Sequence, residues 1–210
     1  MARNFSPRGR IERREQQDLS LFSGVTPRES KCKVSVAPGQ HGAKRGKLSE
    51  YGKQFRAKQL AKRMYGVLER QFKTYFVKAS AMKGSTGESL LRFLEMRLDN
   101  IVFRLGFART RKEARQLVSH RSISVNNGKE IRTVNLPSYQ LKAGDEVIIR
   151  EKCQKQGRIQ QAMEMAKQRV LSEWLDVKPE EYKGIVRRIP ERSEMPLEIN
   201  ESLIVELYSK

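Results

Sequence analysis

Positive charge is distributed unevenly along this chain, and the distribution limits what the chain can fold into. Its 43 Lys and Arg against 24 Asp and Glu give a net charge of +19 over 210 residues. Residues 1–90 hold 20 basic and 7 acidic side chains, residues 91–152 hold 13 and 7, and residues 153–210 hold 10 of each. Such an excess opposes compaction by self-repulsion unless a polyanion neutralises it. We therefore expect a basic surface on the first two-thirds of the chain, with nucleic acid as the first candidate partner, because neutralised phosphates release condensed counterions.

Length and composition favour one or two folded domains without a membrane partner. Hydrophobic residues make up 38% of the chain, which is lean but above the level of a disordered basic polypeptide. No apolar run approaches the ~20 residues of a membrane-spanning helix, and the first residues do not resemble a signal peptide. The expected location is the cytoplasm, where Cys32 and Cys153 would remain free thiols.

The usual signatures of catalysis and metal binding are missing from the sequence. The run from Gly84 to Ser89 lacks the Lys that a nucleotide-binding phosphate loop needs. Cys32 with His41 supplies at most two of the four ligands of a structural zinc site. No Ser or Cys is paired with a His and a third orienting group. We therefore predict a protein that is not an enzyme, with no catalytic residue, metal or other cofactor.

The N-terminal 47 residues are predicted to be a basic extended segment with little periodic structure. Gly, Pro and Ser are frequent there, and the segment is too poor in apolar residues to order itself, so we expect it to become ordered against its partner. The candidate nucleic-acid-binding residues of this segment are Arg10, Arg13, Arg14, Lys44, Arg45 and Lys47.

A helical pattern runs from Ser49, a plausible N-cap, to about Ala81, and Gly66 may split it. Its basic residues lie away from the apolar stripe, and three of them recur every seven residues, which predicts a single ridge. A solvated charged face is the alternative interpretation. Only Glu50 and Glu69 offer counter-charge within the segment, so ion pairing should not account for the face, and phosphate contact is favoured. The candidate residues are the ridge of Arg56, Arg63 and Arg70, together with Lys53, Lys58 and Lys62.

A second helical pattern, from Leu90 to Leu105, ends at Gly106 as a C-cap. Thr110 and Glu113 then form a capping-box pattern for a short helix that reaches His120. Its first turn and a half carries the candidate residues Arg111, Lys112 and Arg115. Cations at a helix N-terminus oppose the macrodipole, whereas a phosphate bound there would be stabilised by the side chains and the free N–H groups. For His120, base or phosphate contact and a capping or packing role are equally open.

The apolar period changes to two after this helix. Strands are predicted at 123–125 and 147–149, with extended chain at 134–141 between them. Residues 155–170 are predicted to be helical, Trp174 to be an apolar anchor, and 203–208 to be a strand.

Several motifs in order resemble a known family. The stretches 97–107 (RLDNIVFRLGF), 114–120 (ARQLVSH) and 123–126 (ISVN) resemble the S4 RNA-binding domain. Residues 37–42 (APGQHG), 49–52 (SEYG), 65–72 (YGVLERQF), 86–88 (TGE) and the terminus 203–210 are similar to the bacterial small-subunit ribosomal protein S4 family. The resemblance covers essentially the whole chain.

The resemblance implies an α+β fold in two domains. A mainly helical, discontinuous first domain (48–96, completed by 161–210) would follow the N-terminal segment (1–47). Into it would be inserted an S4 RNA-binding domain (97–160), made of a helix-turn-helix and a small β-sheet. Many members hold zinc with four cysteines. Only Cys32 falls at such a place here, with Gly9, Glu12 and Pro27 near the others, which implies a zinc-free form.

The resemblance also implies a function. Members bind the 5′ domain of small-subunit ribosomal RNA at a multi-helix junction, nucleate assembly of the body, contact neighbouring ribosomal proteins at an interface tied to accuracy, and lie near the messenger RNA entry path. Two other classes stay open from the residues. An RNA-modifying or translation-associated protein could use an S4 domain for targeting, and a DNA-binding regulator could use helix-turn-helix geometry.

Overall fold

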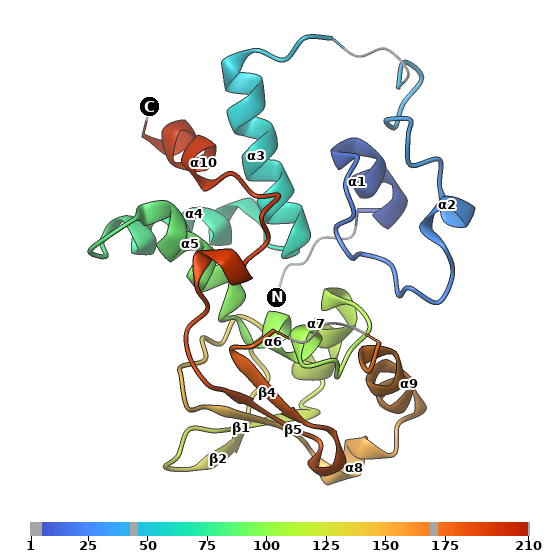
Figure 1. The fold of residues 1–210 in the computed structure, drawn as a ribbon, viewed down its shortest axis with the longest axis vertical. Coiled ribbons are helices and arrows are strands. Elements are labelled where there is room, and N and C mark those ends of the chain that lie inside the picture. Colours follow the sequence, from blue (N-terminus) through green and yellow to red (C-terminus); the bar gives the residue numbers. More distant parts are fainter. Residues whose placement is uncertain (1–5, 43–45, 169–171, 210) are drawn as a thin grey trace. The chain divides into compact units, whose positions relative to one another are not determined.

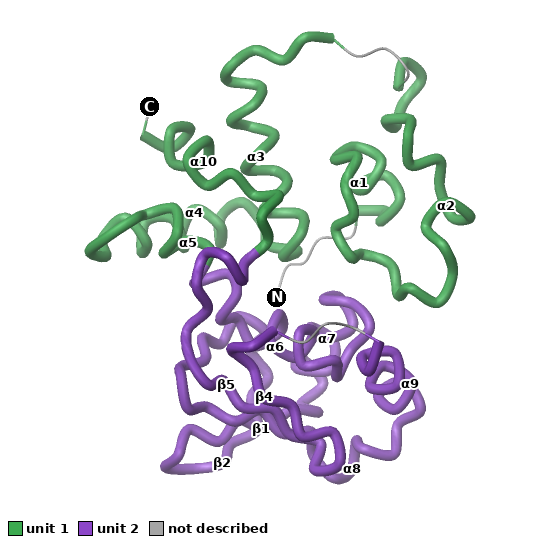
Figure 2. The backbone as a smooth tube through the Cα atoms, in the orientation of Figure 1, with its two compact units in different colours: residues 1–91, 196–210 green, residues 92–195 purple. Residues whose placement is uncertain are grey.

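The computed structural model describes residues 6–42, 46–168 and 172–209. It divides into two compact units, one formed by residues 1–91 with 196–210 and one by residues 92–195 (Figure 2). The chain thus leaves unit 1, forms unit 2, and returns to complete unit 1. The sequence interpretation assigned all of 161–210 to the first domain, whereas the structure places 161–195 in unit 2, because two strands in this stretch extend the sheet of that unit.

Unit 1 is helical in its described residues. It contains α1 (Arg8–Glu15), α2 (Arg28–Lys31), α3 (Glu50–Met64), α4 (Glu69–Ser80), α10 (Glu201–Tyr208) and the first part of α5 (Thr86–Glu95) (Figure 1). The expectation of an extended N-terminal segment with little periodic structure was therefore wrong for α1 and α2. Burial of Ile11, Leu19 and Leu21 supplies an apolar contact that the low overall hydrophobicity of the segment concealed.

The predicted break at Gly66 is confirmed. Ser49 caps α3 by accepting a hydrogen bond from the Gly52 N–H over 3.1 Å. Gly66 has a φ of +65°, in the left-handed region that favours glycine, and α4 starts three residues later. The two helices therefore have separate axes, and residues on them do not share one ridge.

The predicted C-terminal strand was wrong, because residues 201–208 form α10. Asn200 caps this helix by accepting from the Leu203 N–H at 3.4 Å. The β-branched run suggested a strand, but Ile204 is buried and α10 packs along α3, where Gln54 donates to Glu206 over 2.9 Å. Tertiary packing overrides the local β-propensity here.

Unit 2 combines short helices with an antiparallel sheet. Its helices are α6 (Leu98–Arg104), α7 (Arg111–Ser119), α8 (Glu151–Gln154) and α9 (Gly157–Ala166), with 3-10 turns at Pro179–Glu181 and Arg192–Glu194. The strands are β1 (Ile123–Asn126), β2 (Ile131–Thr133), β3 (Glu146–Ile149), β4 (Leu175–Lys178) and β5 (Lys183–Val186). Within the described residues the sheet order is β2-β1-β3-β5-β4. The strands predicted at 123–125 and 147–149 are confirmed, and the sequence interpretation missed β2, β4 and β5.

The core of unit 2 joins one face of this sheet to its helices. Register places Val125 opposite Val147 and Val147 opposite Gly184. Trp174, just before β4, is fully buried in the same cluster as Leu117 and Ile159. The interpretation of Trp174 as an apolar anchor is therefore confirmed.

Gly106 ends α6 as predicted and has no room for a side chain. Its φ is +81°, and a Cβ built on it would lie 2.3 Å from the Cβ of Ala166. The glycine thus permits both the left-handed turn after α6 and the close approach of α9.

Candidate nucleic-acid interface

The N-terminal candidate cations have different environments. Arg13 is held by the backbone, since its Nε donates to the Val36 carbonyl over 2.8 Å and its Nη2 to the Ala37 carbonyl over 3.2 Å. Arg10, Arg14 and Lys47 are exposed. Lys44 and Arg45 lie outside the described residues. The exposure of Arg10, Arg14 and Lys47 makes these three side chains accessible to a phosphate.

The predicted ridge of three arginines is corrected by the structure. Arg56 and Arg63 on α3 both pair with Glu15 at the end of α1, Arg56 Nη2 lying 2.6 Å from Glu15 Oε2. Only 3% of the Glu15 side chain is exposed. Burial lowers the pKa of the Arg56 guanidinium, and the Glu15 charge partly offsets this. Arg70 lies on α4 instead and is exposed.

A second carboxylate, Glu69 at the start of α4, organises the lysines beside them. Lys58 Nζ donates to its Oε1 over 2.8 Å and Lys62 Nζ to its Oε2 over 3.0 Å. Tyr208 of α10 also donates to Oε1, over 3.1 Å. Burial alone would raise the pKa of the Glu69 carboxyl, but the hydrogen bonds and charges of the two lysines outweigh it and lower the pKa to about 2. Glu69 therefore joins α3, α4 and α10.

The expectation that ion pairing could not account for this face was wrong, but the face stays positive. Glu15 is shared by two arginines and Glu69 by two lysines. Each cluster consequently carries a net charge of +1 and has its cations fixed in space. Lys53 pairs only with the exposed Glu50, at 2.7 Å, among the ion pairs of the described residues. Pairing with shared carboxylates orders the cations without cancelling them.

The Glu69 cluster predicts a pH dependence of stability. Because the folded-state pKa is depressed, the stabilisation is present above about pH 4.5 and lost as the pH falls towards 2. Glu69→Gln should lower the unfolding free energy at pH 7 by about 1 kcal/mol, a value reduced for a half-exposed side chain. Urea unfolding followed by circular dichroism between pH 7 and pH 2.5 measures both effects.

The control for this prediction is Glu50→Gln, because Glu50 is 75% exposed and its partner Lys53 is on the same helix. That variant should change stability by a few tenths of a kcal/mol at most. Identical pH dependence in the wild type and Glu69→Gln would contradict the assigned role of Glu69.

In unit 2 the predicted basic helix start is formed by α7. The capping prediction is confirmed for Thr110, whose Oγ1 accepts from the Glu113 N–H over 3.2 Å, while the Glu113 carboxylate accepts from the N–H of Arg109 over 2.9 Å. Arg111 and Arg115 are half-buried, as is Lys112, and His120 is exposed at the C-cap. This helix therefore presents cations beside its own N–H groups.

Residues that sequence reasoning missed hold these cations in place. Arg111 Nε donates to Asn100 Oδ1 over 2.8 Å, and its Cζ lies 4.6 Å from the Phe103 ring centroid. Arg115 Nη1 lies 3.4 Å from Asp99 Oδ2. Asp99 and Asn100 lie in the 97–107 motif, so their polarity within an apolar helical pattern was the available signal. Glu15 gave no comparable signal, since its segment was interpreted as loop.

Possible metal ligands and a pocket are candidate features besides the basic clusters in the part of the chain that the structure describes. In 6–42, 46–168 and 172–209, no group of three or more His, Cys, Asp or Glu could hold a metal ion. Gly9 packs on Cys32, where a Cβ built on Gly9 would lie 3.7 Å from the Cys32 Sγ, but glycine offers no ligand, so these residues do not fit the family's zinc site.

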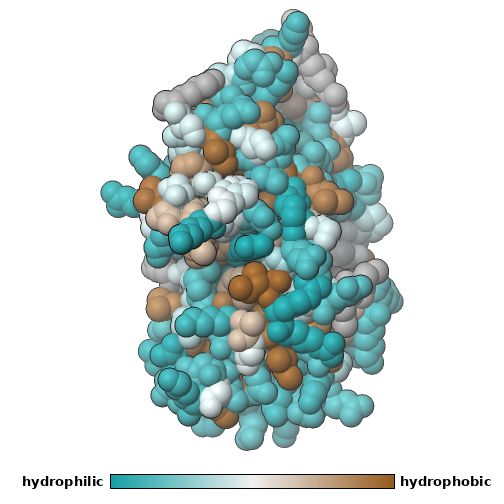
Figure 3. All heavy atoms as spheres, turned by 60° about the vertical axis from the view of Figure 1, so that its left-hand side comes forward, coloured by the Kyte–Doolittle hydropathy of each residue, from teal (hydrophilic) through white to brown (hydrophobic). Residues whose placement is uncertain are grey.

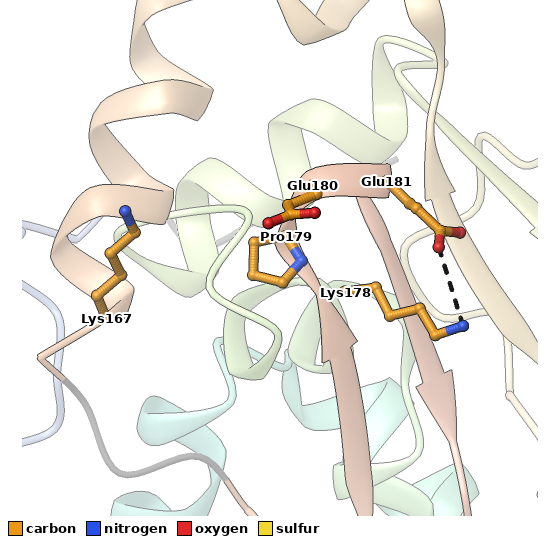
Figure 4. A pocket seen from close by; sticks show the side chains of 5 residues that line it. All are labelled: Lys167, Lys178, Pro179, Glu180 and Glu181. Atoms are coloured by element: carbon orange, nitrogen blue, oxygen red, sulfur yellow. Dashed lines mark ion pairs between the residues drawn. The ribbon is translucent and has the colours of Figure 1, made fainter.

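A pocket of about 390 Å³ is lined by Lys167 and by residues 178–181, where Lys178 pairs with Glu181 at 4.0 Å (Figure 4). Two lysines and two glutamates leave its lining without a net charge.

The described surface is mainly hydrophilic on the face drawn in Figure 3, where hydrophobic residues form small, separate patches. No helix within the described ranges has the length and hydrophobicity to span a bilayer.

Comparisons with known proteins agree with this geometry. The family model described as the ribosomal protein S4/S9 N-terminal domain matches residues 3–95, and the S4 domain model matches residues 96–147. The chain is 54% identical over 210 residues to a small ribosomal subunit protein uS4 from Saccharophagus degradans, covering 100% of both chains. It is 54% identical to the uS4 protein of Stutzerimonas stutzeri and 53% identical to that of Teredinibacter turnerae, with the same full coverage. With its helical first unit, its basic α7 and matches along its whole length, the chain belongs to the uS4 family of small-subunit ribosomal proteins, a structural and non-enzymatic family.

Proposed function

We propose that this chain is a structural constituent of the small ribosomal subunit in the cytoplasm, and that it binds small-subunit ribosomal RNA directly. The observation that carries the proposal is the arrangement of cations in both units. In unit 1 each of Glu15 and Glu69 is shared by two cations, and in unit 2 basic side chains surround the start of α7. Preorganised positive charge of this kind binds phosphate with little further ordering.

The site on the RNA would be the multi-helix junction of the 5′ domain, and binding there would nucleate assembly of the body. Helical RNA has a deep, narrow major groove that side chains read poorly, so a folded junction is held through its backbone and minor groove. Exposed and half-buried cations on several elements suit such a shape. The candidate contacts are Arg10, Arg14, Lys47, Lys53, Arg56, Lys58, Lys62, Arg63 and Arg70 in unit 1 and Arg111, Lys112, Arg115 and His120 in unit 2.

Contacts with neighbouring ribosomal proteins, through which the chain would contribute to translational accuracy, are part of the same proposal. Tyr51 and Phe55 on α3 support it, because they are 61% and 37% exposed and their ring centroids lie 6.1 Å apart. Exposed aromatic side chains are enriched in protein interfaces. Proximity to the messenger RNA entry path would involve the basic segment before α3, which includes Lys47.

RNA binding is tested by titrating the full chain against a transcribed 5′-domain junction RNA and against duplex DNA of equal length, at several salt concentrations. We expect tighter binding to the junction and a steep linear fall of log K with log salt. Arg70→Gln should weaken binding and reduce the salt slope by about one unit if Arg70 neutralises one phosphate.

The control is Lys155→Gln, because Lys155 is exposed in the stretch of the chain that carries no net charge. It should leave the slope unchanged. Equal affinity for junction RNA and duplex DNA at every salt concentration would overturn the proposed function.

A further inference from the structure

We infer that Asn100 is a positioning residue for RNA recognition, which fixes the guanidinium of Arg111 at the start of α7 in its binding orientation. The inference rests on the proposed function, because it presupposes that α7 meets RNA. It adds that a buried amide, which cannot touch RNA itself, sets the geometry of a cation that does.

The orientation of the Asn100 side chain is determined by Glu95. Asn100 is 2% exposed, and its Nδ2 donates both to the Glu95 carbonyl over 2.9 Å and to Glu95 Oε2 over 2.6 Å. Both acceptors are oxygens, one of them on a carboxylate, so the NH₂ end of the amide must face them. The amide oxygen of Asn100 therefore has a single direction.

Glu95 is itself rigidly held, so it can serve as a fixed reference. It is fully buried, and its carboxylate accepts two hydrogen bonds from Arg104, from Nε to Oε2 and from Nη2 to Oε1, both over 2.7 Å. A bidentate arginine–carboxylate pair of this geometry restricts both side chains. The 2.6 Å hydrogen bond from Asn100 Nδ2 to Glu95 Oε2 therefore restricts the Asn100 side chain as well.

Arg111 completes the series of hydrogen-bonded side chains that runs from Arg104 through Glu95 and Asn100. Its Nε donates to Asn100 Oδ1 over 2.8 Å, and Phe103 lies against its face, with 4.6 Å between Cζ and the ring centroid. The guanidinium is thus held at one edge and on one face. Because the guanidinium is planar, these two contacts fix the direction of the whole group.

Ordering Arg111 before binding should increase affinity. Immobilising a side chain with many rotamers upon association opposes binding, and a side chain that is already ordered avoids most of that cost. We expect Asn100→Ala to weaken binding to the junction RNA about threefold to tenfold.

A double-mutant cycle on the full chain tests the inference. Affinity for the transcribed 5′-domain junction RNA is measured at one salt concentration for wild type, Asn100→Ala, Arg111→Ala and the double variant. If Asn100 acts through Arg111, Asn100→Ala weakens binding in the wild-type background but by less than about twofold when Arg111 is already absent. An equal loss in both backgrounds would show a general structural role and overturn the inference.

Further variants keep this test decisive. Asn100→Ser replaces Asn100→Ala in the cycle if the alanine variant does not fold, and Phe103→Leu measures separately what the ring beneath Arg111 contributes. Asn126→Ala is the matched control, because Asn126 is a half-buried amide of the same unit that donates to Glu146 over 3.0 Å. It should bind RNA as the wild type does.

The outcomes separate the inference from the proposed function. A wild-type chain that shows no preference for the junction RNA would overturn the proposed function. A wild type that binds the junction while Arg111→Ala binds equally well would overturn only the inference about Asn100.

Discussion

Trp174→Ala is expected to lower the free energy of unfolding of unit 2 by about 3–5 kcal/mol. Trp174 is fully buried in the cluster that joins the sheet to α7 and α9. Its removal deletes the largest fully buried side chain among the described residues and leaves a cavity that the neighbouring strands cannot fill without leaving their register. Urea unfolding followed by far-ultraviolet circular dichroism measures the loss.

Trp174→Phe is the comparison for this prediction. It keeps an aromatic ring in the core and should cost far less than alanine. Trp174 is the only tryptophan in the sequence, so tryptophan fluorescence of the wild type reports the unfolding of unit 2. A loss below about 1 kcal/mol in the alanine variant would show that the cluster can collapse into the vacated space.

Asp99→Ala is expected to destabilise unit 2 by a similar amount, because it breaks a buried ion pair and not because it leaves a cavity. Arg97 is fully buried, and it pairs with Asp99 through two hydrogen bonds, Nε to Oδ1 over 2.9 Å and Nη2 to Oδ2 over 2.6 Å. Loss of the carboxylate removes this bidentate counter-charge from a buried guanidinium, which costs about 3–5 kcal/mol. Thermal and urea unfolding at neutral pH measure it.

The double substitution of Arg97→Met with Asp99→Leu separates the two contributions of this pair. Replacing both charges by apolar groups of similar volume is often neutral, so the double variant should be more stable than Asp99→Ala alone. If the double variant were the less stable of the two, the pair would contribute through hydrogen bonds and not through compensation of a buried charge.

Local features of the fold could be predicted from the sequence. The break at Gly66, the turn at Gly106 and the Thr110 cap each depend on a few adjacent residues, and all three are present. The prediction for the C-terminal segment was wrong because residues 203–208 have a strand-like pattern, whereas the Asn200 cap and packing against α3 and α4, more than 100 positions away, make them helical. Strands β4 and β5 were missed for the same reason, since β5 pairs with β3, which ends well before it, and β4 pairs only with β5.

The candidate site shows the same division between local and distant signals. Spacing along the chain located the basic residues of α3 and α7, because cations at helical intervals can be read directly. Their partners were not predictable, since Glu15 lies 41 and 48 positions from the two arginines it joins. The roles of Asp99 and Asn100 also depend on how α6 packs against α7.

The interrupted course of unit 1 sets an order of events during synthesis. Residues 92–195 are contiguous, so that unit can acquire all of its own strands and helices before the last fifteen residues have been made. Unit 1 cannot, because α10 covers α3 and supplies the Tyr208 hydroxyl to Glu69. A nascent chain stalled before residue 196 would therefore hold a finished second module and a first module with an uncovered apolar flank.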